Sequence, residues 1–149
     1  MPILIEKADI PYAPQQVFDL VADIENYPKF LRHIVSARIR HRNGNTLLVD
    51  QVVRLKMLRL RFSTRAVLDR PSRIQVVCTD SMFGTFEEQW AFAPSPSGGT
   101  HLLCRTEYKF RSDLLRMALS ATLAELFKTT VKAFESRGRQ LYGRDVASG

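Results

Sequence analysis

The stretch SDLLRMALSATLAELFKTTVKAFESRGRQLY, residues 112–142, contains no proline and one glycine, Gly138. It predicts a long α-helix capped by Ser112, whose hydroxyl can accept a hydrogen bond from a first-turn amide. Apolar residues at helical spacing form one arc of this helix: Leu115, Leu119, Leu123, Leu126, Phe127, Ala133, Phe134 and Leu141. The chain is therefore expected to close with a helix that packs against another layer.

Two polar side chains, Thr130 and Arg137, interrupt this apolar arc. One interpretation is a core stripe that tolerates the threonine, with the arginine reaching solvent from its end. The other is that both residues line a cavity between the helix and the layer beneath it. The spacing alone leaves both interpretations open.

The first half of the helix, residues 114–124, is apolar on nearly every side, with Leu114 and Met117 opposite the arc. A helix that is apolar all round is buried or faces something other than water. We therefore expect a contact surface for a membrane or a partner near Leu114 and Met117. The alternative is that an N-terminal segment covers them.

The chain before this helix predicts mainly strands. Apolar alternation and turn signals place strands at 3–10, 34–42, 47–57, 58–68, 74–79, 83–92 and 101–110, with short helices at 14–21 and 24–31. Asn43-Gly44 predicts a hairpin turn. The order predicts an α+β helix-grip fold, in which a curved antiparallel sheet of about seven strands grips the C-terminal helix.

The length of 149 residues fits one domain, 1–149, with a flexible tail at 143–149. The first residues show no signal-peptide pattern, and no apolar run approaches the ~20 residues of a membrane span. We therefore expect a cytoplasmic protein. Cys78 and Cys104 fall on the apolar sides of their strands, where small buried hydrophobes are expected.

Several inward positions of the expected sheet are polar, namely Thr64, Glu88 and Thr106. Buried polar groups need partners, so these positions indicate that hydrocarbon does not fill the whole space between sheet and helix. A layered fold of this kind usually holds an apolar ligand there.

Positive charge is concentrated in one part of the chain. Residues 38–73 contain ten basic and two acidic residues, which gives +8 in a protein whose net charge is +7. The sign suits anionic lipid headgroups or RNA phosphates, and the alternative is a solvated outer sheet face. The basic surface is formed by Arg38, Arg40, Arg54, Lys56, Arg59, Arg61 and Arg65.

The sequence offers little catalytic chemistry. His33, His41 and His101 are scattered, and no nucleophile motif, phosphate-binding loop or metal-ligand spacing is present. Glu88 could act alone as an acid or base in a cyclase-type enzyme, although a hydrogen-bonded or rim position fits it better. We expect a protein that is not an enzyme, without metal or catalytic cofactor.

Three stretches resemble a known family: FDLVADIENYPKFL at 18–31, the segment 78–94 around WAFAP, and 110–143 from FRS to YG. Together they resemble the coenzyme Q-binding START-like family of the polyketide cyclase/dehydrase superfamily. Bacterial members are labelled ribosome association toxin, the toxin of a toxin–antitoxin pair. The family usually continues with Pro-Trp-Cys where this chain has Arg32-His33-Ile34, which removes an aromatic residue from the expected mouth.

The resemblance implies a START/Bet v 1-like fold and a non-catalytic protein that binds ubiquinone and supports respiratory electron transfer or quinone delivery. For the bacterial label it also implies interference with ribosomal subunit association, and the alternative function is therefore contact with the ribosome or RNA. The apolar start of the helix and the basic sheet face predict a transient contact with an anionic membrane, such as the inner membrane surface. The quinone ring needs donors, for which Tyr27, His33, Arg65, Trp90 and Arg137 are candidates. The isoprenoid tail needs an apolar slot that leads toward the membrane, because a pocket of roughly 300–1,000 Å³ cannot enclose a very long tail. The expected ligand-binding residues are Tyr27, Phe30, Leu31, His33, Leu60, Phe62, Phe83, Phe86, Trp90, Tyr108, Leu119, Leu123, Phe127, Thr130 and Phe134.

Overall fold

The computed structural model describes residues 3–80 and 83–143. In chain order its elements are β1 (Ile3–Ile10), α1 (Pro14–Ala22), the 3₁₀ helix η1 (Ile24–Lys29), β2 (Ile34–Asn43), β3 (Thr46–Leu55), β4 (Leu58–Asp69), β5 (Arg73–Asp80), β6 (Phe83–Pro94), β7 (Thr100–Phe110) and α2 (Asp113–Tyr142). The predicted α+β helix-grip order is confirmed. Apart from Gly143, the predicted flexible tail at 143–149 lies outside the described residues.

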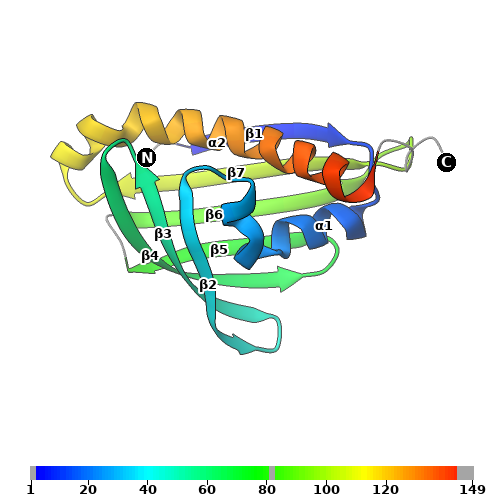
Figure 1. The fold of residues 1–149 in the computed structure, drawn as a ribbon, viewed down its shortest axis with the longest axis horizontal. Helices are drawn as coiled ribbons and strands as arrows, with labels where there is room; N and C mark the ends of the chain where they lie inside the picture. Colours follow the sequence, from blue (N-terminus) through cyan, green and yellow to red (C-terminus); the bar gives the residue numbers. More distant parts are fainter. Residues whose placement is uncertain (1–2, 81–82, 144–149) are drawn as a thin grey trace.

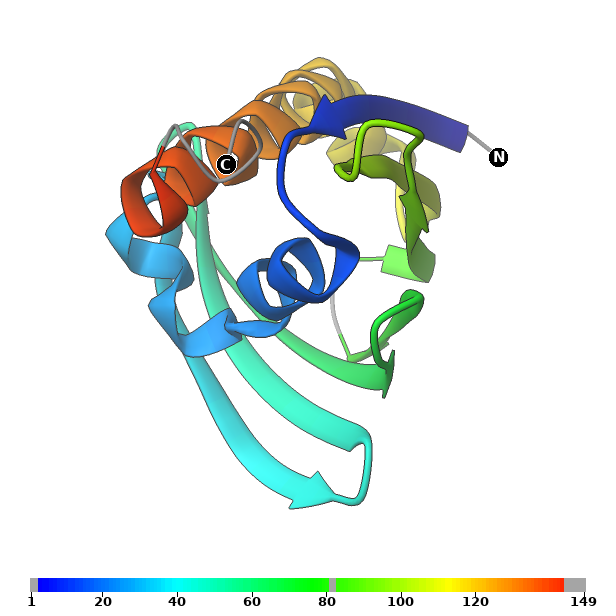
Figure 2. The ribbon, with the colours of Figure 1, turned by 90° about the vertical axis from the view of Figure 1, so that its right-hand side faces the viewer.

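The strands form one antiparallel seven-stranded sheet in the order β1-β7-β6-β5-β4-β3-β2. From β2 to β7 each strand pairs with the next along the chain, as short connections favour, and β1 pairs with β7. The β2–β3 turn is Gly44-Asn45 and not the predicted Asn43-Gly44, because Asn43 pairs with Thr46 and Gly44 takes the left-handed φ of 60°. The sheet curls, and α2 lies across its concave side (Figures 1 and 2).

The predicted cap of α2 is confirmed. The Ser112 hydroxyl accepts a hydrogen bond from the Leu115 amide at 3.2 Å, and Gly143 ends the helix with a φ of 79°. The buried positions of α2 are Leu119, Leu123, Val131, Phe134 and Gly138. The prediction that Leu141 faces inward is wrong, since 50% of it is exposed. Phe134, Gly138 and Tyr142 are spaced four residues apart, so they lie on the inner face of the helix in its last turns.

The end of α2 is held by close packing against the segment that follows β1. A Cβ atom on Gly138 would lie 3.0 Å from Cε2 of Tyr12, so the tyrosine ring occupies the space that a side chain would need. The ring of Tyr12 also lies 5.4 Å from the ring of Tyr142, and its hydroxyl donates to the Gly143 carbonyl. Glycine at position 138 therefore permits this contact.

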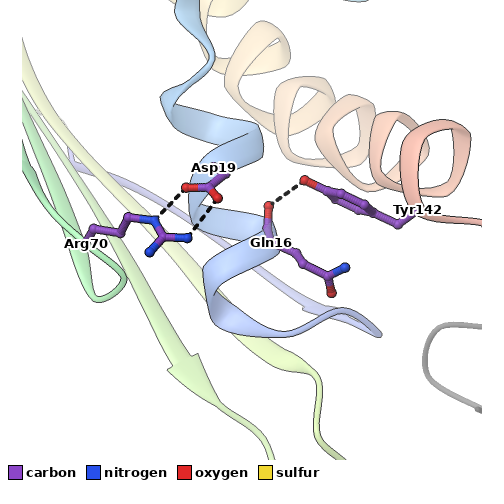
Figure 3. Close-up of polar contacts among 4 residues, drawn as sticks. All are labelled: Gln16, Asp19, Arg70 and Tyr142. Atoms are coloured by element: carbon purple, nitrogen blue, oxygen red, sulfur yellow. Dashed lines mark hydrogen bonds and ion pairs between the residues drawn. The ribbon is translucent and has the colours of Figure 1, made fainter.

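Helix α1 occupies one end of the space between α2 and the sheet (Figure 2). Two contacts fix it from opposite sides (Figure 3). Arg70, after β4, donates from Nε and Nη2 to the carboxylate of Asp19 at 2.8 and 2.9 Å, and the Tyr142 hydroxyl donates to the Gln16 carbonyl at 3.0 Å. With this end closed, the remaining space lies beside η1, the middle of α2 and strands β3 to β6.

The start of α2 is left open to solvent. Leu114 and Met117 are 77% and 75% exposed, although β1 packs along the same helix. The described N-terminal strand therefore does not cover them, and the apolar surface predicted there is exposed. No helix in the described part of the chain is long and apolar enough to cross a membrane.

Candidate functional site

A cavity of about 130 Å³ lies between α2 and the sheet. Its wall is mainly apolar and aromatic, and it is smaller than the roughly 300–1,000 Å³ typical of ligand pockets. An engineered cavity of about 150 Å³ holds one benzene, so the space suits one ring. The residues around it are Tyr27, Leu31, His33, Ile34, Gln51, Val53, Leu55, Phe62, Thr64, Val76, Cys78, Phe83, Phe86, Glu88, Trp90, Leu123, Leu126, Phe127, Thr130 and Phe134.

Most residues expected to bind a ligand lie around this cavity. The structure brings together Tyr27, Leu31, His33, Phe62, Phe83, Phe86, Trp90, Leu123, Phe127, Thr130 and Phe134. They come from η1 and the segment that follows it, from the two strands β4 and β6, and from the middle of α2. Inward alternation on strands and i,i+4 spacing on the helix are the sequence signals that located them.

Four predicted residues lie elsewhere. Tyr108 and Leu119 are 3% and 1% exposed and belong to the packed core, with the Tyr108 ring 6.0 Å from that of Phe83. Leu60 packs against the same core, and Phe30 lines a neighbouring groove. Alternation assigned Tyr108 and Leu60 to the correct face, but it cannot tell which positions along that face are filled by neighbouring side chains.

Two aromatic groups line the cavity. In one group, the rings of Phe83 and Phe86 lie 5.0 Å apart, and Phe127 from α2 lies 6.3 Å from Phe86. In the other, the Phe134 ring meets Tyr27 and Trp90 edge-on at 5.4 and 5.5 Å. Such contacts place flat apolar faces around the cavity and fix their rotamers.

Three polar side chains at the cavity are available for a ligand: His33, Gln51 and Thr64. Among the described residues, no hydrogen bond joins the His33 ring, the Gln51 amide or the Thr64 hydroxyl to another protein group. Gln51 was missed as a binding residue, although its inward position between Val49 and Val53 on β3 is a signal that could have found it. Burial lowers the pKa of His33, which favours the neutral ring.

Glu88 also lines the cavity, and its carboxyl group accepts hydrogen bonds from two side chains. Trp90 Nε1 donates at 2.8 Å and Thr106 Oγ1 at 3.4 Å, and no described lysine or arginine forms an ion pair with it. Burial raises its pKa above the ordinary value, and the two hydrogen bonds oppose this rise. The group is therefore a positioned, partly satisfied carboxyl inside an apolar wall.

The other donors expected for a ligand ring are not available there. The Tyr27 hydroxyl donates to the Val21 carbonyl, and Trp90 donates to Glu88. Arg65 is exposed on the outer face of the sheet, and the Arg137 guanidinium lies 5.3 Å from the centre of the Phe30 ring, outside the cavity. Thr130 does line the cavity, but its hydroxyl donates to the Leu126 carbonyl at 2.7 Å.

A groove of about 510 Å³ adjoins the cavity and shares Leu31, His33, Leu126 and Thr130 with it. These shared residues form the boundary between the cavity and the groove. The groove is also lined by Phe30, Arg32, Arg54, Lys56, Thr129 and Ala133. It thus combines an apolar floor with a cationic rim.

All seven residues of the predicted basic surface are exposed: Arg38, Arg40, Arg54, Lys56, Arg59, Arg61 and Arg65. Arg40 forms an ion pair with Asp50 at 3.2 Å. Arg54 and Arg59 face each other directly across β3 and β4, where like charges repel and are destabilising unless an anion lies between them. Within residues 3–80 and 83–143, no group of three or more His, Cys, Asp or Glu could hold a metal ion.

Residues 10–135 match a family model described as polyketide cyclase / dehydrase and lipid transport. The chain is 30% identical over 136 residues to the ribosome association toxin RatA of Rickettsia prowazekii, covering 89% of this chain and 92% of that protein. It is 25% identical over 144 residues to the mitochondrial coenzyme Q-binding protein COQ10 homolog B of Xenopus laevis, covering 93% of this chain and 59% of that protein. A START superfamily protein from Mycobacterium smegmatis shares the fold, with a TM-score of 0.82, 17% identity and coverage of 93% and 98%.

Proposed function

The chain belongs to the polyketide cyclase/dehydrase and lipid transport family, and on that premise we propose that it binds a polyprenyl quinone, ubiquinone, between its sheet and α2. The observation that carries this proposal is the ring-sized cavity with aromatic walls and three available polar side chains. A relative named as a coenzyme Q-binding protein supports the choice of ligand. The protein would support respiratory electron transport or quinone delivery, as one START-like domain over residues 1–149 in the cytoplasm.

The quinone ring would occupy the cavity. Its carbonyl and methoxy oxygens only accept hydrogen bonds, and the Gln51 amide, the Thr64 hydroxyl and a neutral His33 ring can each donate one. The flat aromatic walls would contact both ring faces. Available donors within an apolar wall match a ligand that is apolar except for a few oxygens.

The isoprenoid tail would leave through the groove, because the cavity of about 130 Å³ has no room for it. At ~0.8 kcal/mol per buried CH₂, two five-carbon isoprene units contribute about 8 kcal/mol, close to the free energy of micromolar binding. The apolar floor formed by Phe30, Leu31, Leu126 and Ala133 can cover a segment of this kind.

Binding without catalysis is the proposed activity, with no catalytic cofactor. Both carboxyl oxygens of Glu88 accept hydrogen bonds from the protein, which suits a structural and positioning role better than proton transfer to a substrate. The family description includes cyclases and dehydrases, so the distinction needs a test. A Glu88→Gln variant that keeps ligand binding and loses a measured turnover would contradict this part of the proposal.

The direct test is organic extraction of the protein purified from its own host, followed by mass spectrometry. We expect quinone near one molecule per protein, and its absence would count against the proposal. Phe127→Arg places a charge at the cavity wall and should abolish the bound quinone. Leu141→Arg on the exposed side of α2 is the matched control and should retain it.

A second candidate function is contact with the ribosome or RNA, through the basic surface, in a toxin-type role. It is favoured by the full exposure of that surface and by the relative named ribosome association toxin. Phosphate contacts make binding steeply salt-dependent. Co-sedimentation with ribosomes should then weaken as salt rises and be lost in Arg59→Glu/Arg61→Glu, whereas unchanged sedimentation would remove this candidate.

A further inference from the structure

The three most exposed large hydrophobic side chains of the described residues are Met57, Leu114 and Met117, at 89%, 77% and 75%. Met57 is at the turn between β3 and β4, and the other two are in the first turns of α2. Leu58, beside the turn, is 46% exposed. Isolated apolar residues on a surface are ordinary, but a cluster from two separate elements marks an interaction site.

A hydrogen bond joins these two elements at the end of the molecule where α2 begins. Lys56 Nζ donates to the Ala118 carbonyl at 3.0 Å, so the residue before Met57 is bound to the residue after Met117. Figure 1 shows the β3–β4 turn beside the first half of α2. The three exposed side chains therefore lie on one surface, here called the apolar tip and defined as Met57, Leu114 and Met117.

Exposed basic residues lie beside the apolar tip on both elements. Those nearest to it along the chain, here called the cationic ring, are Arg54, Lys56, Arg59, Arg61 and Arg116. The nearby acid Asp113 is paired with Arg116 at 3.5 Å, and the directly opposed Arg54 and Arg59 have no described carboxylate between them. Exposed apolar side chains within a cationic ring are complementary to a bilayer surface, where they enter the acyl boundary while the cations meet anionic headgroups.

We propose that the apolar tip and its ring of basic residues dock the protein on an anionic membrane, with the groove mouth against the bilayer. Arg54 and Lys56 belong both to this ring and to the rim of the groove, so docking brings the groove to the lipid surface. This inference rests on the proposed function, because it gives a tail in the groove a path into lipid that avoids water. A surface that only bound RNA phosphates would need the cations but not the exposed methionines and leucine.

The test is flotation with vesicles of phosphatidylcholine alone and of phosphatidylcholine with phosphatidylglycerol. Wild-type protein should bind the anionic vesicles and bind the neutral vesicles weakly. Met57→Ser/Met117→Ser should weaken binding about tenfold or more, because two apolar side chains no longer enter the bilayer. Leu141→Ser removes an apolar side chain that is 50% exposed at the other end of α2, and it should leave binding unchanged.

The charge part of the surface is tested with Arg59→Gln/Arg61→Gln, which should reduce binding to anionic vesicles. Arg42→Gln, exposed near the distant β2–β3 turn, is its control. Equal flotation of wild type and the methionine variant would overturn the proposal. So would arginine variants that lose ribosome co-sedimentation while vesicle binding is kept, since the surface would then serve RNA.

Quinone extraction separates this inference from the proposed function. Protein that carries quinone but ignores both kinds of vesicle would contradict only the docking surface. Protein that floats with anionic vesicles, loses this in Met57→Ser/Met117→Ser, and yields no quinone would contradict only the proposed ligand.

Discussion

The indole nitrogen of Trp90 donates a hydrogen bond to the carboxyl group of Glu88 at 2.8 Å, two residues away on the same face of β6. Both side chains line the cavity, and Thr106 on β7 provides a second donor. The pair fixes the indole plane against Phe134 and keeps a buried acid partly satisfied. An acid in such a position affects stability in a pH-dependent way.

Glu88→Gln should stabilise the protein at neutral pH. Because burial raises the folded pKa of Glu88, its contribution to stability is fully present below the ordinary value of 4.5 and is lost as pH rises through the raised value. Glutamine does not ionise, so the variant does not lose this stability as pH rises, and its amide oxygen can still accept the hydrogen bond from Trp90. Urea unfolding over a pH series should show the two proteins converging at acidic pH, and a variant less stable at every pH would contradict this account.

His33 should make the protein sensitive to mild acid. Burial lowers its folded pKa below the ordinary 6.5, so its contribution to stability is present above pH 6.5 and lost as pH falls through the lowered folded value. In His33→Asn the thermal midpoint should depend less on pH in this window. His41→Asn, on an exposed strand position, should keep the wild-type profile, and equal profiles for all three proteins would exclude His33 as the cause.

Gln51→Leu and Thr64→Val should weaken quinone binding without unfolding the protein. Each removes one donor from the cavity wall while keeping its size, and a hydrogen bond of about 0.5–1.5 kcal/mol corresponds to a loss of roughly 2- to 12-fold. Trp90 is the only tryptophan and lines the cavity, so quenching of its fluorescence by a short-chain quinone reports the affinity. Ser36→Ala, at an exposed position on β2, should bind as wild type does.

Gly138→Val should destabilise the protein even though glycine is a poor helix former. Replacing a helical glycine gains up to about 1 kcal/mol of helix propensity, but overpacking against a filled site costs about 1–3 kcal/mol. The Cβ alone would approach the Tyr12 ring to 3.0 Å, so the packing cost should prevail. Chemical denaturation should show a lower midpoint for this variant, whereas Ser136→Val, exposed on the same helix, should change it little. Equal stability would mean that the Tyr12 ring moves freely.

Much of the cavity could be predicted because its wall follows local periodicity. Alternation on β4 and β6 located Phe62, Phe86 and Trp90, and helical spacing located Leu123 and Phe127. The same periodicity misplaced Leu141, since a helix of 30 residues accumulates small angular errors toward its end, where Tyr142 takes the inner position. Periodicity also could not show that Tyr108 is buried in the packed core whereas Gln51 lines the cavity, because both residues occupy inward positions on their strands.

Local patterns in the chain were enough to predict the order of the elements, the inner and outer faces of the strands, the Ser112 cap and the concentration of charge on residues 38–73. These depend on contacts between residues close along the chain. The cavity volume, the use of Tyr27 and Trp90 as internal donors, and the hydrogen bond from Lys56 to Ala118 became visible only in the folded chain. Those features depend on how far the curved sheet stands from α2 and on which distant side chains fill the gap, and no local pattern encodes that.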